Sequence, residues 1–269
     1  MTNNIMVGNS AGCYGDGFAG WYSKQILTNN TFVGNTAGAG GGGIYCDRTS
    51  DLTVSNTIFW NNDAPLGPEI WIGDDNGWSA LTISYSDLDD GQASIYVEPG
   101  STLNMKAGMI DADPLFVDPA DGDYHLLYHS PCRDAGDASA QGLSFEEFEC
   151  DPRCAGPAPD MGADEFHAHL YYQGDVVPGG TGLIKVSGTS NSYAHVRRST
   201  TLLDPPYPTP FGDLYLGTPR IKICSGIVLP EGYAVFPKTV PPSWIPGDRY
   251  YQQALVGGTL TNVAPLTVQ

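Results

Sequence analysis

Residues 2–12, TNNIMVGNSAG, recur as residues 28–38, TNNTFVGNTAG. Eight of the 11 positions are identical, at an offset of 26 residues. A third copy, NTIFWN at residues 56–61, keeps this offset, and residues 81–84 repeat the pattern of residues 52–55. Periodicity of this length predicts a solenoid in which each repeat forms one coil.

The pattern inside each repeat indicates strands. Apolar residues occupy the even-numbered positions Leu52, Val54 and Ile58, and Ser or Thr occupies most of the positions between them. This period-two alternation is typical of a half-buried strand. The glycine run 40–43 separates two such segments, and each glycine inside a helix would cost about 1 kcal/mol. We therefore expect coils of parallel strands rather than helical repeats.

The offset also predicts which side chains stack from one coil to the next. One apolar ladder and one amide ladder are expected: Met6, Phe32 and Ile58, and Asn4, Asn30 and Asn56.

Charge divides the chain into two parts. Up to Phe166 there are 25 acidic and five basic residues, a net charge of −20, whereas the remainder carries +2. This shift predicts a domain boundary near residue 166. An acidic N-terminal part repels phosphate backbones and anionic lipid, and the apolar runs are far shorter than the ~20 residues that span a bilayer. Roles in nucleic-acid binding and in membrane insertion are therefore excluded.

From Leu170 the sequence changes to short alternating segments separated by Pro-rich turns. Strands are expected at residues 182–186, 194–197, 213–216, 234–237 and 251–256. Their spacing of about 10 to 20 residues predicts an antiparallel β-sandwich.

The repeats resemble right-handed parallel β-helix proteins of bacterial surfaces, in which NNTFxxN followed by a Gly-rich turn is a familiar rung. This resemblance covers residues 1–110. Five later motifs look like the closing segment of the same proteins, often called the choice-of-anchor Q type: DPLFVDP at 113–119, GDYHL at 122–126, SP at 130–131, DAG at 134–136 and DMGADE at 160–165. The C-terminal part is similar to sandwich modules appended to exported bacterial proteins.

Together these features predict an all-β chain in three parts. A right-handed parallel β-helix is expected over residues 1–110, an irregular acidic closing segment over 111–166, and a β-sandwich over 167–269. The resemblance implies an extracellular or cell-surface location but no single reaction. No basic-then-apolar leader opens the sequence, so a secretion signal is expected to precede residue 1.

The six cysteines lack the CxxC pairs of zinc sites. An exported protein keeps its disulfides, and Cys150 and Cys154, which bracket the loop CDPRC, are the expected pair. The other four cysteines are left unassigned.

Catalytic candidates come from the chemistry of β-helix polysaccharide enzymes. Lyases of this fold neutralise a uronate with Ca²⁺ or Arg and abstract a proton with a basic side chain. Asp87, Asp89 and Lys106 are the candidates for a lyase or epimerase, with Asp87 and Asp89 on one strand face. The alternatives are a solvated acidic turn and a structural metal site. A glycosidase set does not assemble, because Asp74-Asp75 and Arg220-Ile221-Lys222 fall in different domains.

Two further groups of residues suggest ligands. Asp118, Asp121 and Asp123 could hold a structural Ca²⁺, although Asp before Pro or Gly is also ordinary turn chemistry. His167 and His169, two residues apart, are interpreted as part of an interdomain linker rather than as metal ligands.

Aromatic residues suggest a carbohydrate surface. Trp21 and the three candidates Trp60, Trp71 and Trp78 would stack on sugar rings if they are exposed along the solenoid. The alternative is that these rings pack between coils.

The expected function is therefore a non-catalytic exported bacterial surface or adhesion module, with polysaccharide as its candidate partner. The first alternative is a polysaccharide-acting lyase, epimerase or glycosidase. The second is an extracellular structural subunit that assembles through an open solenoid end, because the three to four expected coils are few and the first has no capping element.

Overall fold

The chain forms two compact, all-β units. The computed structural model describes residues 1–15, 17–127, 129–148, 153, 157–166, 170–174, 181–188, 193–199, 202–209, 212–216, 220–227, 233–239, 249–256, 259–261 and 264–267. The first unit comprises Met1–Leu126 with Ser130–Phe166, and the second comprises Leu127–His129 with His167–Gln269. Over the described ranges, no helix has the length and hydropathy needed to cross a membrane.

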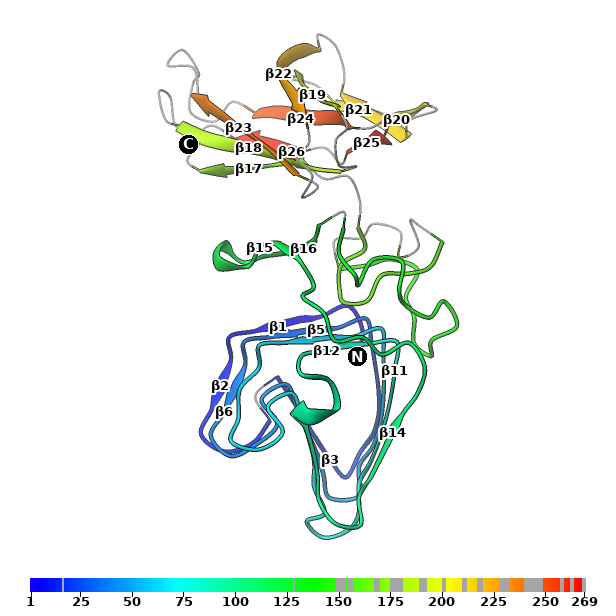
Figure 1. Cartoon of the computed structure of the whole chain (residues 1–269). Helices are drawn as coiled ribbons and strands as arrows, with labels where there is room; N and C mark the ends of the chain where they lie inside the picture. The colour runs from blue at the N-terminus through cyan, green and yellow to red at the C-terminus, as the bar shows by residue number, and fades with distance from the viewer. Residues whose placement is uncertain are drawn as a thin grey trace. The chain divides into compact units, whose positions relative to one another are not determined.

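The N-terminal part of the first unit is a right-handed β-solenoid of about four coils, which Figure 1 shows nearly superimposed on one another. Three parallel four-stranded sheets line it. The first sheet contains β1 (Ile5–Val7), β5 (Thr31–Val33), β9 (Ile58–Trp60) and β12 (Asp87–Leu88). The second contains β3 (Phe18–Trp21), β7 (Ile44–Asp47), β10 (Ile70–Ile72) and β13 (Ile95–Val97). The third contains β4 (Lys24–Thr28), β8 (Asp51–Ser55), β11 (Ala80–Ser84) and β14 (Thr102–Met105).

Two smaller elements complete the coils. Strands β2 (Ser10–Ala11) and β6 (Thr36–Ala37) pair in parallel between the first and second sheets, and the 3-10 turn η1 (Gly91–Ser94) takes that place in the fourth coil.

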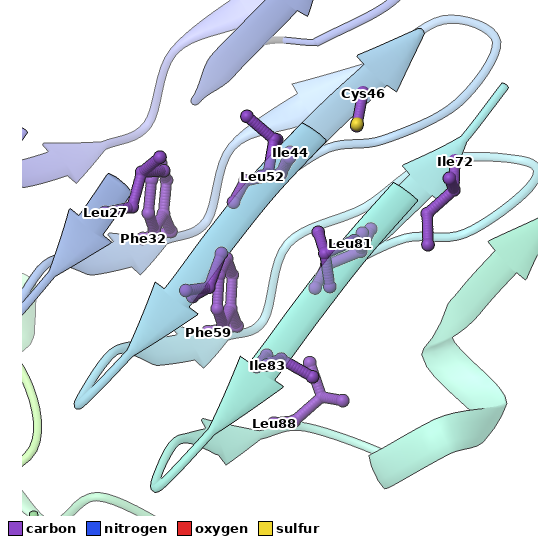
Figure 2. Close-up of a cluster of buried hydrophobic side chains, with 12 residues drawn as sticks. Leu27, Phe32, Ile44, Cys46, Leu52, Phe59, Ile72, Leu81, Ile83 and Leu88 are labelled. Carbon is purple, nitrogen blue, oxygen red and sulfur yellow. The ribbon is translucent and has the colours of Figure 1, made fainter. Parts of the chain in front are cut away.

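Apolar side chains from all three sheets fill the interior of the solenoid (Figure 2). Twelve are fully buried: Leu27, Phe32, Ile44, Cys46, Leu52, Val54, Phe59, Ile70, Ile72, Leu81, Ile83 and Leu88. The rings of Phe32 and Phe59 stack with centroids 5.0 Å apart and planes 3° from parallel. The predicted coil of parallel strands is therefore confirmed, and so is the pairing of residues 52–55 with 81–84.

The predicted ladders are correct for two coils and wrong for the third. Met6 stacks on Phe32, but Phe32 is followed by Phe59 rather than by Ile58. Asn4 Nδ2 donates to Asn30 Oδ1 at 3.1 Å, whereas Asn56 donates to Asn29. The register slips by one residue because the turn after β7 has three residues, 48–50, where the turn after β3 has two, 22–23.

A second amide ladder runs through the coils and ends in a buried carboxyl. Asn9 Nδ2 donates to Asn35 Oδ1 at 2.8 Å, and Asn35 Nδ2 donates to Asn62 Oδ1 at 2.8 Å. Asn62 in turn donates from Nδ2 to Glu69 Oε2 at 2.5 Å. Burial raises the pKa of Glu69 to about 8, although the bonds from Asn62 oppose this shift.

The closing segment lies along the turns between the third and first sheets. Asn29 Nδ2 donates to the carbonyls of Asp160 and Gly162, and Gly162 N donates to Asn56 O at 2.8 Å. Arg153 is fully buried and donates to the carbonyls of Gly162, Ala163 and Asp164. The DMGADE motif is thus a docking element whose backbone satisfies the Asn29 side-chain amide and pairs with the backbone of Asn56.

The closing segment is not wholly irregular. Strands β15 (Phe116–Asp118) and β16 (Asp123–Leu126) form an antiparallel hairpin around the 3-10 turn η2 (Pro119–Asp121).

The second unit contains antiparallel sheets, and each of its five predicted segments lies in a strand. One sheet has the order β17 (Leu170–Gly174), β18 (Thr181–Ser187), β23 (Tyr233–Thr239). Another has the order β22 (Ile221–Ile227), β19 (Tyr193–Ser199), β24 (Arg249–Val256), β25 (Thr259–Leu260), with β26 (Ala264–Thr267) also paired to β24. Strands β20 (Leu202–Thr209) and β21 (Gly212–Leu216) form a separate pair. One apolar cluster joins β18 and β23 to β19 and β24.

Three of the six cysteines are free thiols in the structure. Cys13 is exposed, and Cys46 and Cys132 are buried, all as free thiols. The expected pair, Cys150 with Cys154, lies outside the described residues.

Candidate functional site

The three catalytic candidates do not form an open site. Asp87 is fully buried beneath the closing segment, where its Oδ1 accepts from Ala112 N and its Oδ2 accepts from Cys132 Sγ at 3.2 Å. Burial raises its pKa to about 7. Asp89 lies just beyond β12 and accepts from Asn61 N, and Lys106 is exposed after β14. A substrate cannot reach Asp87 while the closing segment is docked.

The three calcium candidates lie on the β15–β16 hairpin. Asp118 is directly opposite Asp123, whose Oδ1 lies 2.6 Å from His125 Nδ1, and Asp121 is in the η2 turn between them. Within the described ranges, no group of three or more His, Cys, Asp or Glu side chains is arranged to hold a metal ion. Calcium at this hairpin stays a prediction. The histidines His167 and His169 lie outside the described residues.

The three tryptophan candidates occupy three different environments. Trp71 is only 7% exposed, which agrees with the alternative that its ring packs between coils: the ring covers Gly40 and packs edge-on against Tyr14 and Tyr96. Trp60 is half-buried against the cluster under the closing segment. Trp78 is 74% exposed. They do not form one platform.

The turns between the second and third sheets instead bring together other exposed aromatic side chains. We call this stack of turns the aromatic corner and define it as residues 21–23, 47–50, 73–79 and 98–101. Trp21 is 52% exposed and Tyr22 63% exposed on the first coil, and Trp78 lies on the third. At about 4.8 Å per coil, the first and third coils are about 10 Å apart along the axis. A short oligosaccharide could bridge that span.

The aromatic corner is also where the repeats vary in length. Its four turns have two, three, seven and four residues between strands, whereas the turns between the third and first sheets keep two residues in each of three coils. Insertions in solenoid repeats map to loops on one face, which is often the binding face. The variation in turn length is therefore a second indication, independent of the aromatic side chains, that this corner is a binding face.

Buried Asp47 fixes the backbone of the aromatic corner. Its Oδ1 accepts from Arg48 N at 2.7 Å and from Asp75 N at 2.9 Å, and its Oδ2 accepts from Tyr45 Oη at 2.7 Å. A Cβ at position 73 would come within 2.6 Å of Asp47 Oδ1, so this position requires glycine. One buried carboxylate thus holds the turns of two successive coils.

A ladder of serines supports the start of the third sheet. Ser23 N donates to Ser50 Oγ, Ser50 N to Ser79 Oγ, and Ser79 N to Ser101 Oγ at 2.9 Å. The hydroxyls of Ser50, Ser79 and Ser101 thus each accept a hydrogen bond from a backbone amide of the preceding coil, which ties the turns of all four coils together.

The backbone of the corner adopts conformations that are unusual for its residues. Tyr22, Arg48, Thr49 and Asn76 have φ of 50°, 57°, 64° and 61°. For a β-branched residue such as Thr49, positive φ is an outlier that costs about 1–3 kcal/mol. Such strain is found preferentially at binding sites, where surrounding contacts hold it.

Charged groups surround the aromatic rings. The guanidinium of Arg48 lies 5.2 Å from the centroid of the Trp21 ring. Glu98 Oε2 accepts from Asp74 N at 2.8 Å, and burial together with a hydrogen bond to the Asp74 carboxyl raises the pKa of Glu98. Flat apolar rings beside fixed hydrogen-bonding groups are the chemistry that recognises sugars.

The sequence reasoning found Trp21 and Trp78 but missed Tyr22 and Arg48. The signal that could have found them is the change in repeat offset, because residues are added at this corner in the second and third coils.

The comparisons with known proteins agree with the solenoid. No curated protein matches the chain. Residues 1–110 match the family described as "Right handed beta helix region".

Proposed function

We propose that this protein is a non-catalytic, carbohydrate-binding module of an exported bacterial surface protein, and that the aromatic corner binds the glycan. The β-helix fold fits a surface or polysaccharide-related protein. The observation that carries the proposal is the exposure of Trp21, Tyr22 and Trp78 on one stack of turns.

The surface location rests on the wider resemblance. The motifs at 113–119, 122–126 and 160–165 support assignment to the choice-of-anchor Q type, and the shared core of β18, β19, β23 and β24 supports a sandwich module. Both assignments are part of this proposal.

An enzymatic role is less well supported by the geometry. General acid–base chemistry requires side chains within reach of a substrate, and Asp87 is covered by Cys132 and Ala112.

Trp78→Ala is expected to weaken glycan binding at least about fivefold, because removing a central aromatic contact costs more than about 1 kcal/mol. Affinity electrophoresis through gels that contain neutral, amine-bearing or uronate polysaccharides measures this directly. Trp21→Ala is expected to act in the same direction.

Phe145→Ala is the matched control, because Phe145 is 95% exposed on the closing segment and lies outside the corner. It should leave migration unchanged. Equal retardation of wild type and both tryptophan variants would contradict the proposal, as would no retardation in any polysaccharide.

Head-to-tail self-association is a second candidate function, favoured by the ends of the solenoid. In the described part of the chain, β1 pairs only with β5 and β14 only with β11, and the apolar Met6 and Leu103 are half-buried at the two ends. Size-exclusion chromatography with light scattering should show mass increasing with concentration. A constant monomer mass up to about 1 mM would rule out this function.

A further inference from the structure

We propose that the aromatic corner selects amine-bearing glycans over uronate glycans. This inference rests on the proposed function, because it assigns the chemical class of the glycan that the same site binds.

The aromatic corner carries an excess of negative charge. It contains four acidic residues, Asp47, Asp74, Asp75 and Glu98, and one basic residue, Arg48. Lys24, at the start of the adjacent β4, is already paired with Asp51 at 3.1 Å. A uronate carboxylate at this corner would meet an excess of negative charge, within a segment whose net charge is −20.

Hydrogen bonds hold the backbone that carries these carboxyl groups. Asp75 is exposed, and its backbone amide is held by Asp47; the backbone amide of Asp74 is held by Glu98. Burial raises the pKa of Glu98, and the neighbouring Asp74 carboxyl group raises it further, because two like charges so close together disfavour ionisation. An ammonium group carries three donors and no acceptor, so it can satisfy several of these oxygens at once.

The Trp78 ring lies against the turn that carries Glu98. A Cβ on Gly100 would contact the Trp78 indole, so this ring lies against the turn that begins with Glu98. Trp is the best of the aromatic residues for attracting a cation to its face. An amino sugar that stacks on Trp78 therefore brings its ammonium group toward Glu98 and Asp74, and gains from both contacts.

The experiment compares two oligosaccharides that differ mainly in charge. Isothermal titration uses the hexamer of β-1,4-linked glucosamine and the hexamer of N-acetylglucosamine at about pH 6, where the free amines are protonated, with a galacturonate hexamer as the anionic probe. We expect the glucosamine hexamer to bind at least about tenfold more tightly than the acetylated one in 0.05 M NaCl. In 0.5 M NaCl this preference should fall to about twofold, because salt screens exposed charges.

Two kinds of variant separate charge from stacking. Asp75→Asn and Glu98→Gln, singly and combined, should lower the preference for the glucosamine hexamer while leaving affinity for the acetylated hexamer within about twofold. Trp78→Ala should weaken both. Asp63→Asn removes an exposed acidic residue between β9 and β10, outside the corner, and serves as the matched control.

The outcomes distinguish this inference from the proposed function. Equal affinity for the two glucosamine-based hexamers would overturn the charge preference while leaving carbohydrate binding intact, and tighter binding of the galacturonate hexamer would reverse it. Binding of none of the three hexamers would also overturn this inference, and the polysaccharide gels would then decide the proposed function separately.

Discussion

The first unit is expected to unfold at a temperature about 10 °C or more higher at pH 5 than at pH 8. The cause is a set of buried carboxyl groups that keep their protons in the folded state: Glu69 and Asp87 in the solenoid, and Asp160 and Asp164, whose pKa values burial also raises, in the closing segment. Burial raises the pKa of Glu69 from 4.5 to about 8 and that of Asp87 from 3.8 to about 7. Negatively charged neighbours, including Asp89, also raise the pKa of both groups.

The sign of the pH dependence follows from proton binding. Between its ordinary and its raised pKa, each carboxyl group binds a proton in the folded state but not in the unfolded state. The stability due to each proton is therefore fully present below about pH 4 and is lost as pH rises through 7 for Asp87 and 8 for Glu69. Each group changes the free energy of unfolding by at most about 1.4 kcal/mol per pH unit, so Glu69 and Asp87 together contribute on the order of 6 kcal/mol between pH 5 and pH 8.

Tryptophan fluorescence reports this unit, because four of the five tryptophans precede residue 166. One kcal/mol corresponds to about 2–4 °C for a domain of this size, which gives the expected shift. A melting temperature at pH 8 equal to or above that at pH 5 would contradict the prediction.

Asp87→Asn is the variant that isolates the contribution of one of these carboxyl groups to the pH dependence. An amide at this position can still accept from Ala112 N, and it resembles the protonated acid in having no charge. The variant should be more stable than wild type at pH 8 and should lose less stability between pH 5 and pH 8. Asp51→Asn, at an exposed carboxylate paired with Lys24, should keep the wild-type slope. An unchanged slope in Asp87→Asn would show that Asp87 is ionised in the folded protein.

The sequence predicted the coils well because its strongest signal is local. The repeat of residues 2–12 at 28–38 falls in two coils whose first three strands all differ by 26 residues, so Met6 and Phe32 were paired correctly. The third coil was mispaired because a strand pattern reveals period and face but not the length of the preceding turn. One added residue among 48–50 moved Phe59, not Ile58, onto Phe32.

The site was predicted less completely for a different physical reason. Burial of an aromatic residue depends on neighbouring coils, which alternation within one strand does not reveal. Trp71 and Trp78 are close in sequence, yet Trp71 faces Gly40 of the previous coil and is covered, while Trp78 lies on a seven-residue turn and is exposed. The acidic motif at 160–165 was recognisable, but its role in binding Asn29 depended on a contact across 131 residues.

Phe32→Asp is expected to destabilise the solenoid by at least about 5 kcal/mol, which is comparable to the total stability of many domains. Phe32 is fully buried between Met6 and Phe59, and its ring lies against Gly17 of the previous coil. Removing a buried ring costs about 3–5 kcal/mol, and the new carboxyl group would have to be buried without a partner. Urea denaturation followed by fluorescence measures the loss, and insoluble expression is the limiting result.

Two substitutions show whether this cost comes from the stack. Phe32→Leu keeps the site apolar and should cost only about 1–2 kcal/mol, because the smaller side chain leaves part of the space between Met6 and Phe59 unfilled. Phe145→Asp makes the same chemical change at an exposed ring and should stay within about 0.5 kcal/mol of wild type. If Phe32→Asp were as stable as Phe145→Asp, Phe32 could not lie in the interior, and the stacking of successive coils through Met6, Phe32 and Phe59 would be wrong.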